Sequence, residues 1–518
     1  MFMHPVDYKS RPSPLELRAV AAAAGAVAGT AEASSTSKLL TGGTIIAYDA
    51  PSQSLQVVRN GSVLIVDDTI EAVYSGNYDG QLPSHVEVVD TTGDIITPGF
   101  IDTHRHSWQT AFKTLGSNTT LAEYFDRYSE YSVNGEYTPD DVYISQLAGL
   151  YEAMNAGVTT ILDHAHHTWS NATTDAGLQA SIDSGVRMAW CFTFHNVTNF
   201  TFAEQVAKFE EVATSGRLDG TATTLGIAYD GFNPGSPSQT EEIIALAKKY
   251  NVSAITTHSL QGIWGAINSP EDLQALGILN TSIPVVFSHG SFLTGEGASL
   301  LRSTNQYLSI TPESEMHYGH DHPYNHLVQD QAALGVDTHF TYSSDILTQA
   351  RLWLQSARVT FYRWVLNNWN IPANNPMSVN QAFLLATQRG GLALRRSDLG
   401  VIARGAKADV VVWNGNSPGL LGWDDPVAAV VLHANVGDIK HVLVGGEFQK
   451  RDGAIVARGY SAVRDRFLIT ARKIQAIWKQ KALPVLEGDF PESGYAYGRV
   501  PLADVQRGEG TGYGEQFL

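Results

Sequence analysis

The alternation of apolar and polar positions divides the chain into three parts. Residues 39–89 contain short apolar runs separated by turn signals such as Asn60-Gly61, which is the pattern of small β-strands. From residue 94 to about residue 396, apolar runs alternate with stretches of helical period. Short β runs return in residues 397–460, and helical period follows over 461–481.

The middle part contains eight candidate strands with helical patterns between most of them. They are residues 95–102, 158–164, 186–193, 224–229, 254–258, 285–289, 307–311 and 338–345. The clearest helix covers 142–156, because Thr138 can cap it, Pro139 suits its first turn and Gly157 ends it. Eight such units predict an α/β fold, a (β/α)8 TIM barrel. The flanking β segments most simply form one small β-sandwich domain from both ends of the chain.

These changes of pattern set the expected boundaries. They give a loosely ordered leader (1–37), the first part of the small β domain (38–93), the barrel (94–396), the second part of the β domain (397–460), and a C-terminal helix with an extended tail (461–518). Mixed charges in the leader are unlike a secretory signal, so we expect a cytoplasmic protein. Several N-x-S/T triplets leave secretion, and cleavage of the leader, open.

Composition narrows the classes of partner and of metal ligand. The formal net charge is −18 and the chain has no strongly basic run, which argues against nucleic acid and anionic membranes as partners. A small-molecule substrate fits better. Cys191 is the single cysteine, so any metal must be held by His, Asp or Glu.

Titratable side chains gather where the predicted strands end. His104 and His106 follow the first strand, and residues i and i+2 of a strand point to the same face. His258, His289 and Asp345 end the fifth, sixth and eighth candidates. Active sites of these barrels lie at the carboxyl ends of the strands, and burying five such groups without partners would be costly. The pattern therefore predicts a metal site at the mouth of the barrel.

Three segments resemble the amidohydrolase superfamily, in the branch that contains triazine hydrolases and cytosine, guanine and S-adenosylhomocysteine deaminases. They are PGFIDTHRH (98–106), AGVTTILDH (156–164) and GVIARGAKADVVV (400–412). The resemblance implies a hydrolase with a mononuclear site and a homo-oligomeric assembly. Binuclear relatives carry a lysine or glutamate on the fourth strand, and residues 225–230 offer no lysine.

The resemblance also assigns roles to individual residues. It makes His104, His106, His258 and Asp345 the metal ligands, with Asp345 also accepting the proton of the hydrolytic water and His289 orienting that water. Three imidazoles and a carboxylate suit one Zn²⁺, while Fe²⁺ and Mn²⁺ stay open. Such an ion lowers the pKa of a bound water towards neutrality.

One position departs from the deaminases of this branch. They carry a proton-shuttling glutamate three residues after the fifth-strand histidine, where this chain has Gln261, and an amide cannot carry that proton. Glu313 and Glu315 are the nearest acids that could replace it. For substrate contacts we consider Gln261, Trp108, Glu313 and His164.

The sequence thus predicts a metal-dependent hydrolase that cleaves a C–N bond of a cyclic or aromatic small molecule: an amide, a lactam or an amino-heterocycle. Three alternatives stay open. The enzyme could be a deaminase that releases ammonia from an amino-heterocycle, a metal-dependent lyase or decarboxylase, or a protein that binds a small molecule without catalysis. The substrate itself is not readable from barrel loops in one sequence.

Overall fold

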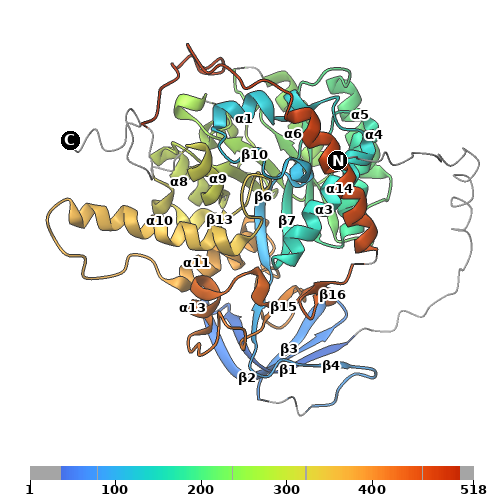
Figure 1. The fold of residues 1–518 in the computed structure, drawn as a ribbon, viewed down its shortest axis with the longest axis vertical. Helices are drawn as coiled ribbons and strands as arrows, with labels where there is room; N and C mark the ends of the chain where they lie inside the picture. The colour runs from blue at the N-terminus through green and yellow to red at the C-terminus, as the bar shows by residue number, and fades with distance from the viewer. Residues whose placement is uncertain are drawn as a thin grey trace, which may run out of the picture.

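The computed structural model describes residues 37–501, apart from 77, 79, 236, 266, 321–323 and 458. The predicted leader up to residue 36 and the last part of the predicted tail, 502–518, lie outside the described residues. A barrel occupies the centre of the molecule, and a smaller β unit lies against one end of it (Figure 1). None of the described helices is both long enough and apolar enough to cross a membrane.

The barrel is a parallel sheet of eight strands in the order of the chain. Its strands are β6 (Phe100–Arg105), β7 (Val158–Ala165), β8 (Arg187–Phe194), β9 (Thr223–Tyr229), β10 (Ile255–Ser259), β11 (Val285–His289), β12 (Tyr307–Ile310) and β13 (Ala332–Leu334). The first and last strands approach each other, because the amides of Val336 and Asp337 both donate to the carbonyl of His104, at 3.0 and 2.8 Å. The predicted TIM barrel is confirmed.

The eighth strand was predicted wrongly. Residues 338–345 form turns and bends rather than a strand, and β13 lies upstream, in an apolar run that leads to Asp337. The hydroxyl of Tyr342 donates to the carbonyl of Val336, so the chain folds back after the strand. The predicted stretch ends at Asp345, which precedes helix α10 (Ile346–Leu366) and caps it.

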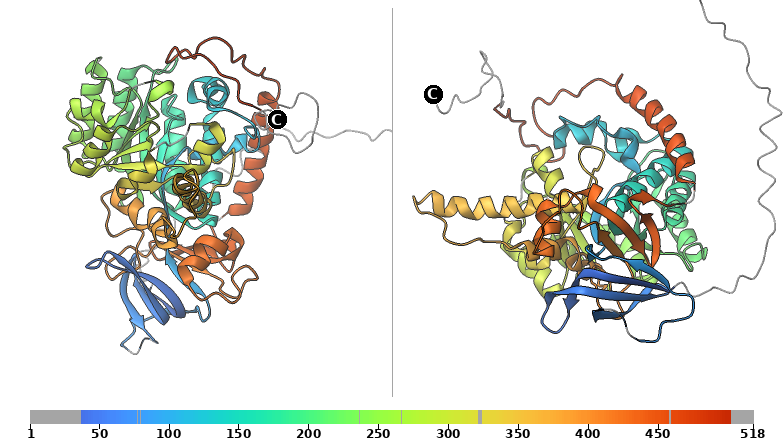
Figure 2. Two further views of the ribbon diagram at one scale, coloured as in Figure 1. Left: turned by 90° about the vertical axis from the view of Figure 1, so that its left-hand side faces the viewer. Right: turned by 60° about the horizontal axis from the view of Figure 1, so that its bottom comes forward.

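Helices follow the strands and surround the barrel. Those between β6 and β13 are η2 (Ser107–Phe112), α1 (Leu121–Arg127), α2 (Glu130–Val133), α3 (Pro139–Asn155), α4 (Asn171–Ser184), α5 (Phe202–Thr214), α6 (Pro237–Lys249), η3 (Gly262–Trp264), α7 (Pro270–Ala275), α8 (Gly295–Thr304), α9 (Pro312–Tyr318), η4 (Asn325–Leu327) and η5 (Gln329–Gln331). Helix α3 begins with the predicted cap, because Thr138 and Asp141 form a reciprocal capping box. Helix α10 projects from the body and leads to α11 (Val379–Ala386) and α12 (Gln388–Ala393) (Figure 2).

The small β unit is built from both ends of the chain, and its nine strands belong to one hydrogen-bonded sheet. The strands are β1 (Lys38–Asp49), β2 (Ser54–Val66), β3 (Thr69–Ser75), β4 (Glu87–Asp90), β5 (Ile95–Pro98), β14 (Val410–Trp413), β15 (Ile439–Val444), β16 (Glu447–Arg451) and β17 (Ala454–Ile455). The predicted strand 95–102 is divided at Gly99 into β5 and β6. A side chain at Gly99 would collide with Thr159, so only glycine lets the chain pass from one sheet to the other.

The C-terminal part of the described chain packs against helices that surround the barrel. After α13 (Pro426–Ala428), η6 (Ala429–His433) and η7 (Val436–Asp438), helix α14 (Tyr460–Trp478) packs against α3 and η2. Residues 479–501, which follow it, contain no helix and run towards α1, as Figure 1 shows. There the ring of Phe490 lies against the rings of Phe125 and Trp264. The tail thus covers the loop that follows β6.

A buried ion pair joins the barrel to the small sheet and gives a first prediction. Asp409 is buried, receives two hydrogen bonds from the Arg187 guanidinium at 2.9 and 3.0 Å, and accepts the Gly445 amide at 2.7 Å. Asp409→Ala leaves a mostly buried cation alone, so we expect a loss of about 3 kcal/mol in the free energy of unfolding, measured by urea denaturation. Asp330→Ala is the control, because it removes an equally bidentate but exposed pair with Arg302 and should cost less than about 1 kcal/mol. Equal losses would contradict the prediction.

Candidate active site

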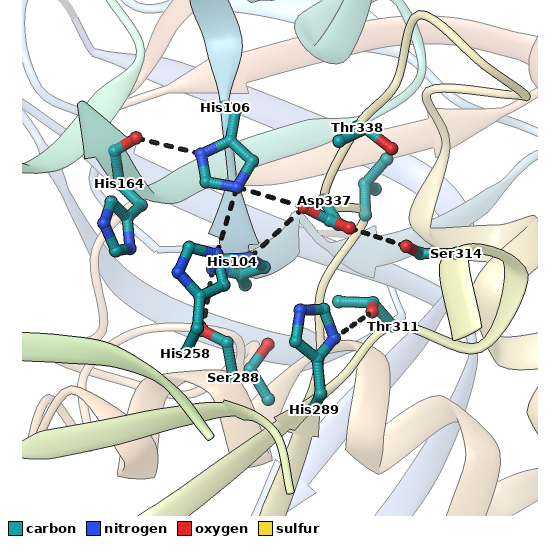
Figure 3. Close-up of polar contacts among 12 residues, drawn as sticks. His104, His106, His164, His258, Ser288, His289, Thr311, Ser314, Asp337 and Thr338 are labelled. Atoms are coloured by element: carbon teal, nitrogen blue, oxygen red, sulfur yellow. Dashed lines mark hydrogen bonds and ion pairs between the residues drawn. The ribbon is translucent and has the colours of Figure 1, made fainter. Parts of the chain in front are cut away.

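Three histidines and one aspartate converge at the mouth of the barrel. His104 lies in β6, His106 directly follows that strand and His258 lies in β10, and all three face Asp337, which follows β13 (Figure 3). The Oδ1 of Asp337 lies 3.3 Å from Nε2 of His104 and 3.1 Å from Nε2 of His106. Nε2 of His258 lies 3.2 Å from Nε2 of His106. We call these four residues the His/Asp cluster.

Each imidazole of the cluster is fixed through its outer nitrogen. Nδ1 of His104 lies 2.7 Å from the Ser288 hydroxyl, Nδ1 of His106 lies 3.1 Å from the carbonyl of His164, and Nδ1 of His258 lies 2.7 Å from a carboxylate oxygen of Asp230. Because the three partners hold Nδ1, all three Nε2 atoms are turned towards Asp337. Such outer hydrogen bonds orient and tune histidine ligands in metal sites.

These outer bonds decide what the cluster can hold. A carbonyl and a carboxylate only accept, so His106 and His258 must donate from Nδ1, and their Nε2 atoms carry lone pairs when the rings are neutral. These two Nε2 atoms lie 3.2 Å apart beside the Asp337 carboxylate, so they can share a cation: a proton on His258 in the metal-free protein, or a metal ion. Nε2 of His104 is buried without a hydrogen bond. The donor set therefore fits a divalent metal ion.

In the structure Asp337, rather than Asp345, faces the three histidines, in the place that the sequence analysis gave to Asp345. Both carboxylate oxygens of Asp345 accept from Thr348, at 2.6 Å from its amide and 2.9 Å from its hydroxyl, and they cap α10. Asp337 is 6% exposed, and Ser314 donates to its second oxygen at 2.6 Å. Burial raises the pKa of Asp337, but the histidines that face it outweigh this and hold the pKa well below its usual range.

Asp230 is a second acid that the sequence analysis did not single out, although it ends the predicted fourth strand. Its two oxygens accept from the amide and the ring of His258, both at 2.7 Å. Burial lowers the pKa of His258, but Asp230 outweighs burial and raises it to about 9. The side chain of His164, a predicted substrate contact, lies 3.6 Å from Asp230 and against the ring of His258. Asp230 thus fixes His258 towards the cluster.

His289 lies where the sequence analysis expected it, at the end of β11 beside the cluster. The centre of its ring is 5.2 Å from the centre of the His104 ring. Its Nδ1 lies 3.0 Å from the Thr311 hydroxyl and 3.2 Å from Glu315, which accepts its proton. Burial lowers the pKa of His289 well below its usual range, so the ring is neutral. The backbone of His289 has a positive φ of 73°, a strained conformation typical of functional positions.

The other predicted substrate contacts, Trp108, Glu313 and Gln261, lie in different parts of the structure. Trp108 is fully buried, and its indole donates at 2.9 Å to His166, whose ring stacks on His106 at 4.0 Å. Glu313 accepts from Ser343 and Gln349 on the side of α10. Gln261 is buried at the end of β10, with its amide donating to Ser259 at 3.2 Å. Trp108 therefore holds the ring of His166 against His106.

A cavity of about 520 Å³ opens beside Asp230. Glu130 and Tyr131 of α2 line it together with residues at the ends of β8 and β9. The sequence analysis did not single out Glu130, since an isolated acid in a long loop carries no motif. Asp230, which lines the cavity, contacts His258 of the cluster.

Comparison with known proteins identifies the chain. The pattern of the amidohydrolase family matches residues 95–448, which include the whole cluster. The chain belongs to the amidohydrolase family. It is 25% identical over 400 residues to 5-methylthioadenosine/S-adenosylhomocysteine deaminase from Pyrococcus abyssi, with 74% of this chain and 88% of that protein aligned.

Two solved structures share the amidohydrolase fold. An adenosine deaminase from Xanthomonas campestris with bound zinc superimposes with a TM-score of 0.72 and 17% identity, over 86% of this chain and 99% of the other. An atrazine chlorohydrolase from Arthrobacter aurescens complexed with zinc superimposes with a TM-score of 0.71 and 17% identity, over 84% of this chain and 100% of the other. This amidohydrolase is thus a hydrolase of C–N bonds, as the motifs predict, and the His/Asp cluster supports a divalent metal ion.

The placement of the two aspartates gives the second prediction. We expect purified Asp337→Ala to contain less than about a tenth of the metal found in the unchanged protein, because the ion would lose its only carboxylate ligand. Substitution of a residue that merely hydrogen-bonds to a metal ligand already lowers the metal affinity by about 10–100-fold. Asp345→Ala should keep its metal and lose about 1 kcal/mol of stability, as expected for a helix cap. Elemental mass spectrometry and urea denaturation measure the two effects. Loss of metal from Asp345→Ala, with Asp337→Ala unaffected, would contradict this assignment.

Proposed function

We propose that this amidohydrolase removes the exocyclic amine of a flat amino-heterocycle by hydrolysis and releases it as ammonia. The cluster of His104, His106, His258 and Asp337 holds one divalent metal ion in this proposal. Its relatives of similar length include an enzyme named for deaminating 5-methylthioadenosine and S-adenosylhomocysteine, and that likeness supports a purine-like substrate. The cavity beside Asp230 has room for such a ring.

The observation that carries the proposal is the arrangement of acceptors in the cluster. Nε2 of His106 lies 3.2 Å from Nε2 of His258 and 3.1 Å from a carboxylate oxygen of Asp337, and the four ligand atoms of the cluster all lie within 4.8 Å of one another. When bound there, a divalent ion lowers the pKa of a water molecule and polarises an electrophilic carbon. Three nitrogens and one oxygen suit Zn²⁺ best, and Fe²⁺ or Mn²⁺ would fit the same donors.

The surrounding residues orient the water and take its proton. Asp337 is ionised and lies at the cluster, so its carboxylate can accept a proton from the attacking water. Because Glu315 holds Nδ1–H of His289, the neutral ring presents an Nε2 lone pair, which accepts a hydrogen bond from the water and fixes its direction. The hydrogen bond from Ser314 to Asp337 and that from Nδ1 of His289 to Glu315 keep both groups in place before the substrate arrives.

A single ion is part of the proposal. His164, Asp230 and His258 also lie close enough together to be considered as ligands. However, Nδ1 of His258 already donates to Asp230 at 2.7 Å, and this contact turns Nε2 towards the first cluster. Asp230 acts better as the partner that orients His258 than as a ligand of a second ion.

The third prediction tests the function itself. The purified protein is incubated with 5′-modified adenosines, aminopurines, aminotriazines and lactams, and ammonia is measured with an enzyme-coupled assay. We expect ammonia from at least one amino-heterocycle. Removing the metal with a chelator should abolish the release, and one equivalent of Zn²⁺ per chain should restore it, because the water is activated at the His/Asp cluster.

Other products would contradict deamination. Ring-opened products without ammonia would identify a lactam or amide hydrolase. Products that contain no oxygen from ¹⁸O-labelled water would identify a lyase. Tight binding of a heterocycle by the metal-loaded protein without any product would identify a binding protein.

A further inference from the structure

We propose that Glu130 is the acid that protonates the departing amine in this enzyme. The inference rests on the proposed deamination and adds a catalytic residue from the loop after β6. It is carried by three observations: the residue at the expected position of the acid cannot transfer a proton, the other acids near the cluster are engaged elsewhere, and Glu130 lines the cavity beside Asp230.

The chemistry requires such a donor. Water adds OH to the ring carbon and H to the ring nitrogen, and the C–N bond to the amine then breaks, with its electron pair leaving on nitrogen. An amide anion is a very poor leaving group, so this nitrogen must gain a proton as the bond breaks. The remaining hydroxyl loses its proton as it becomes a carbonyl, and that proton restores the donor. Water thus supplies both protons, and the donor ends the cycle unchanged.

The acids around the cluster are committed to other partners. Oε1 of Glu315 accepts from the amide and hydroxyl of Thr311 and from His289. Glu313 accepts from Ser343 and Gln349. Asp230 is held ionised by His258, which lowers its pKa far below the usual range although burial acts against this.

Gln261 follows β10, at the position where the deaminases of this branch carry a proton-shuttling glutamate. Its amide donates to Ser259 at 3.2 Å, and an amide offers no exchangeable acid near neutral pH. The backbone of Gln261 has a positive φ of 58°, so its direction is set by the turn into η3. Gln261 can bind a substrate group, but the proton must come from another residue.

Glu130 is placed to supply it. It begins α2, and with Tyr131 it lines the cavity that Tyr229 and Asp230 also line. Asp230 in turn contacts His258, so the cavity that Glu130 lines adjoins a residue of the cluster. Aromatic side chains of the same cavity, among them Phe194, suit a flat ring.

The surroundings of Glu130 also favour its acid form. Burial raises the pKa of Glu130 to about 7, and the negative charge of Asp230 adds to this effect, while its own backbone amide and the charges of His258 and His106 act in the opposite direction. A carboxyl group with such a pKa is a good proton donor near neutral pH.

The test uses two leaving groups on one heterocycle. Chloride departs without a proton, whereas an amine needs one. Glu130→Gln keeps the shape of the side chain but has no acidic proton, so we expect kcat for the amino compound to fall by about 10²–10⁴-fold, the usual contribution of general acid catalysis. Turnover of the chloro compound should stay near that of the unchanged enzyme. Metal content and KM for the amino compound should also stay close to their original values.

Glu136→Gln is the matched control, because Glu136 lies in the same loop but pairs with Lys481 at the surface. It should leave both substrates unaffected. Equal losses on both substrates in Glu130→Gln, or a loss of its metal, would show that Glu130 only shapes the site. No loss on the amino compound would show that another group is the acid. If the unchanged enzyme released no ammonia from any amino-heterocycle, the proposed function would fall and this role with it.

Discussion

The hydrogen bonds to the outer nitrogens of three imidazoles hold the rest of the site in place. Ser288, the carbonyl of His164 and Asp230 each take one Nδ1, and they come from three different strands of the barrel. As a result the Nε2 atoms of His106 and His258 lie 3.2 Å apart, and Nε2 of His106 lies 3.1 Å from Asp337, an arrangement of donor atoms that suits a metal ion. The barrel matters here because it brings the ends of these strands to one face.

Buried residues outside the His/Asp cluster hold the side chains of His106 and His289 in place. Trp108 holds His166 against His106, and Glu315 fixes His289. The loop after β6 therefore has two roles: its first turn supports the histidines from behind, while α2 carries Glu130 to the cavity. Residues of the C-terminal tail pack on α1 of the same loop through the contact of Phe490 with Phe125.

Local patterns in the sequence were enough for the barrel and for four of the residues at its mouth. His104, His106, His258 and His289 end apolar runs, and each lies where the runs predict. The acids of the site were harder to predict, because the sequence patterns around them are weak. The run AALGV before Asp337 is short and interrupted by glycine. The sequence pattern therefore predicts the eighth strand over residues 338–345 and the carboxylate ligand at Asp345. Asp230 and Glu130 could not be found from spacing, since their role depends on contacts between distant segments. The predicted domain boundaries and homo-oligomeric assembly stay predictions.

Anomalous X-ray diffraction at the metal edge, on crystals of protein purified without chelator, tests the central claim most directly. The account predicts one anomalous peak, about 2.0–2.2 Å from the Nε2 atoms of His104, His106 and His258 and from a carboxylate oxygen of Asp337. Asp345 should remain at the start of α10, away from the peak. A peak coordinated by Asp345, or an additional peak between His164 and Asp230, would contradict it.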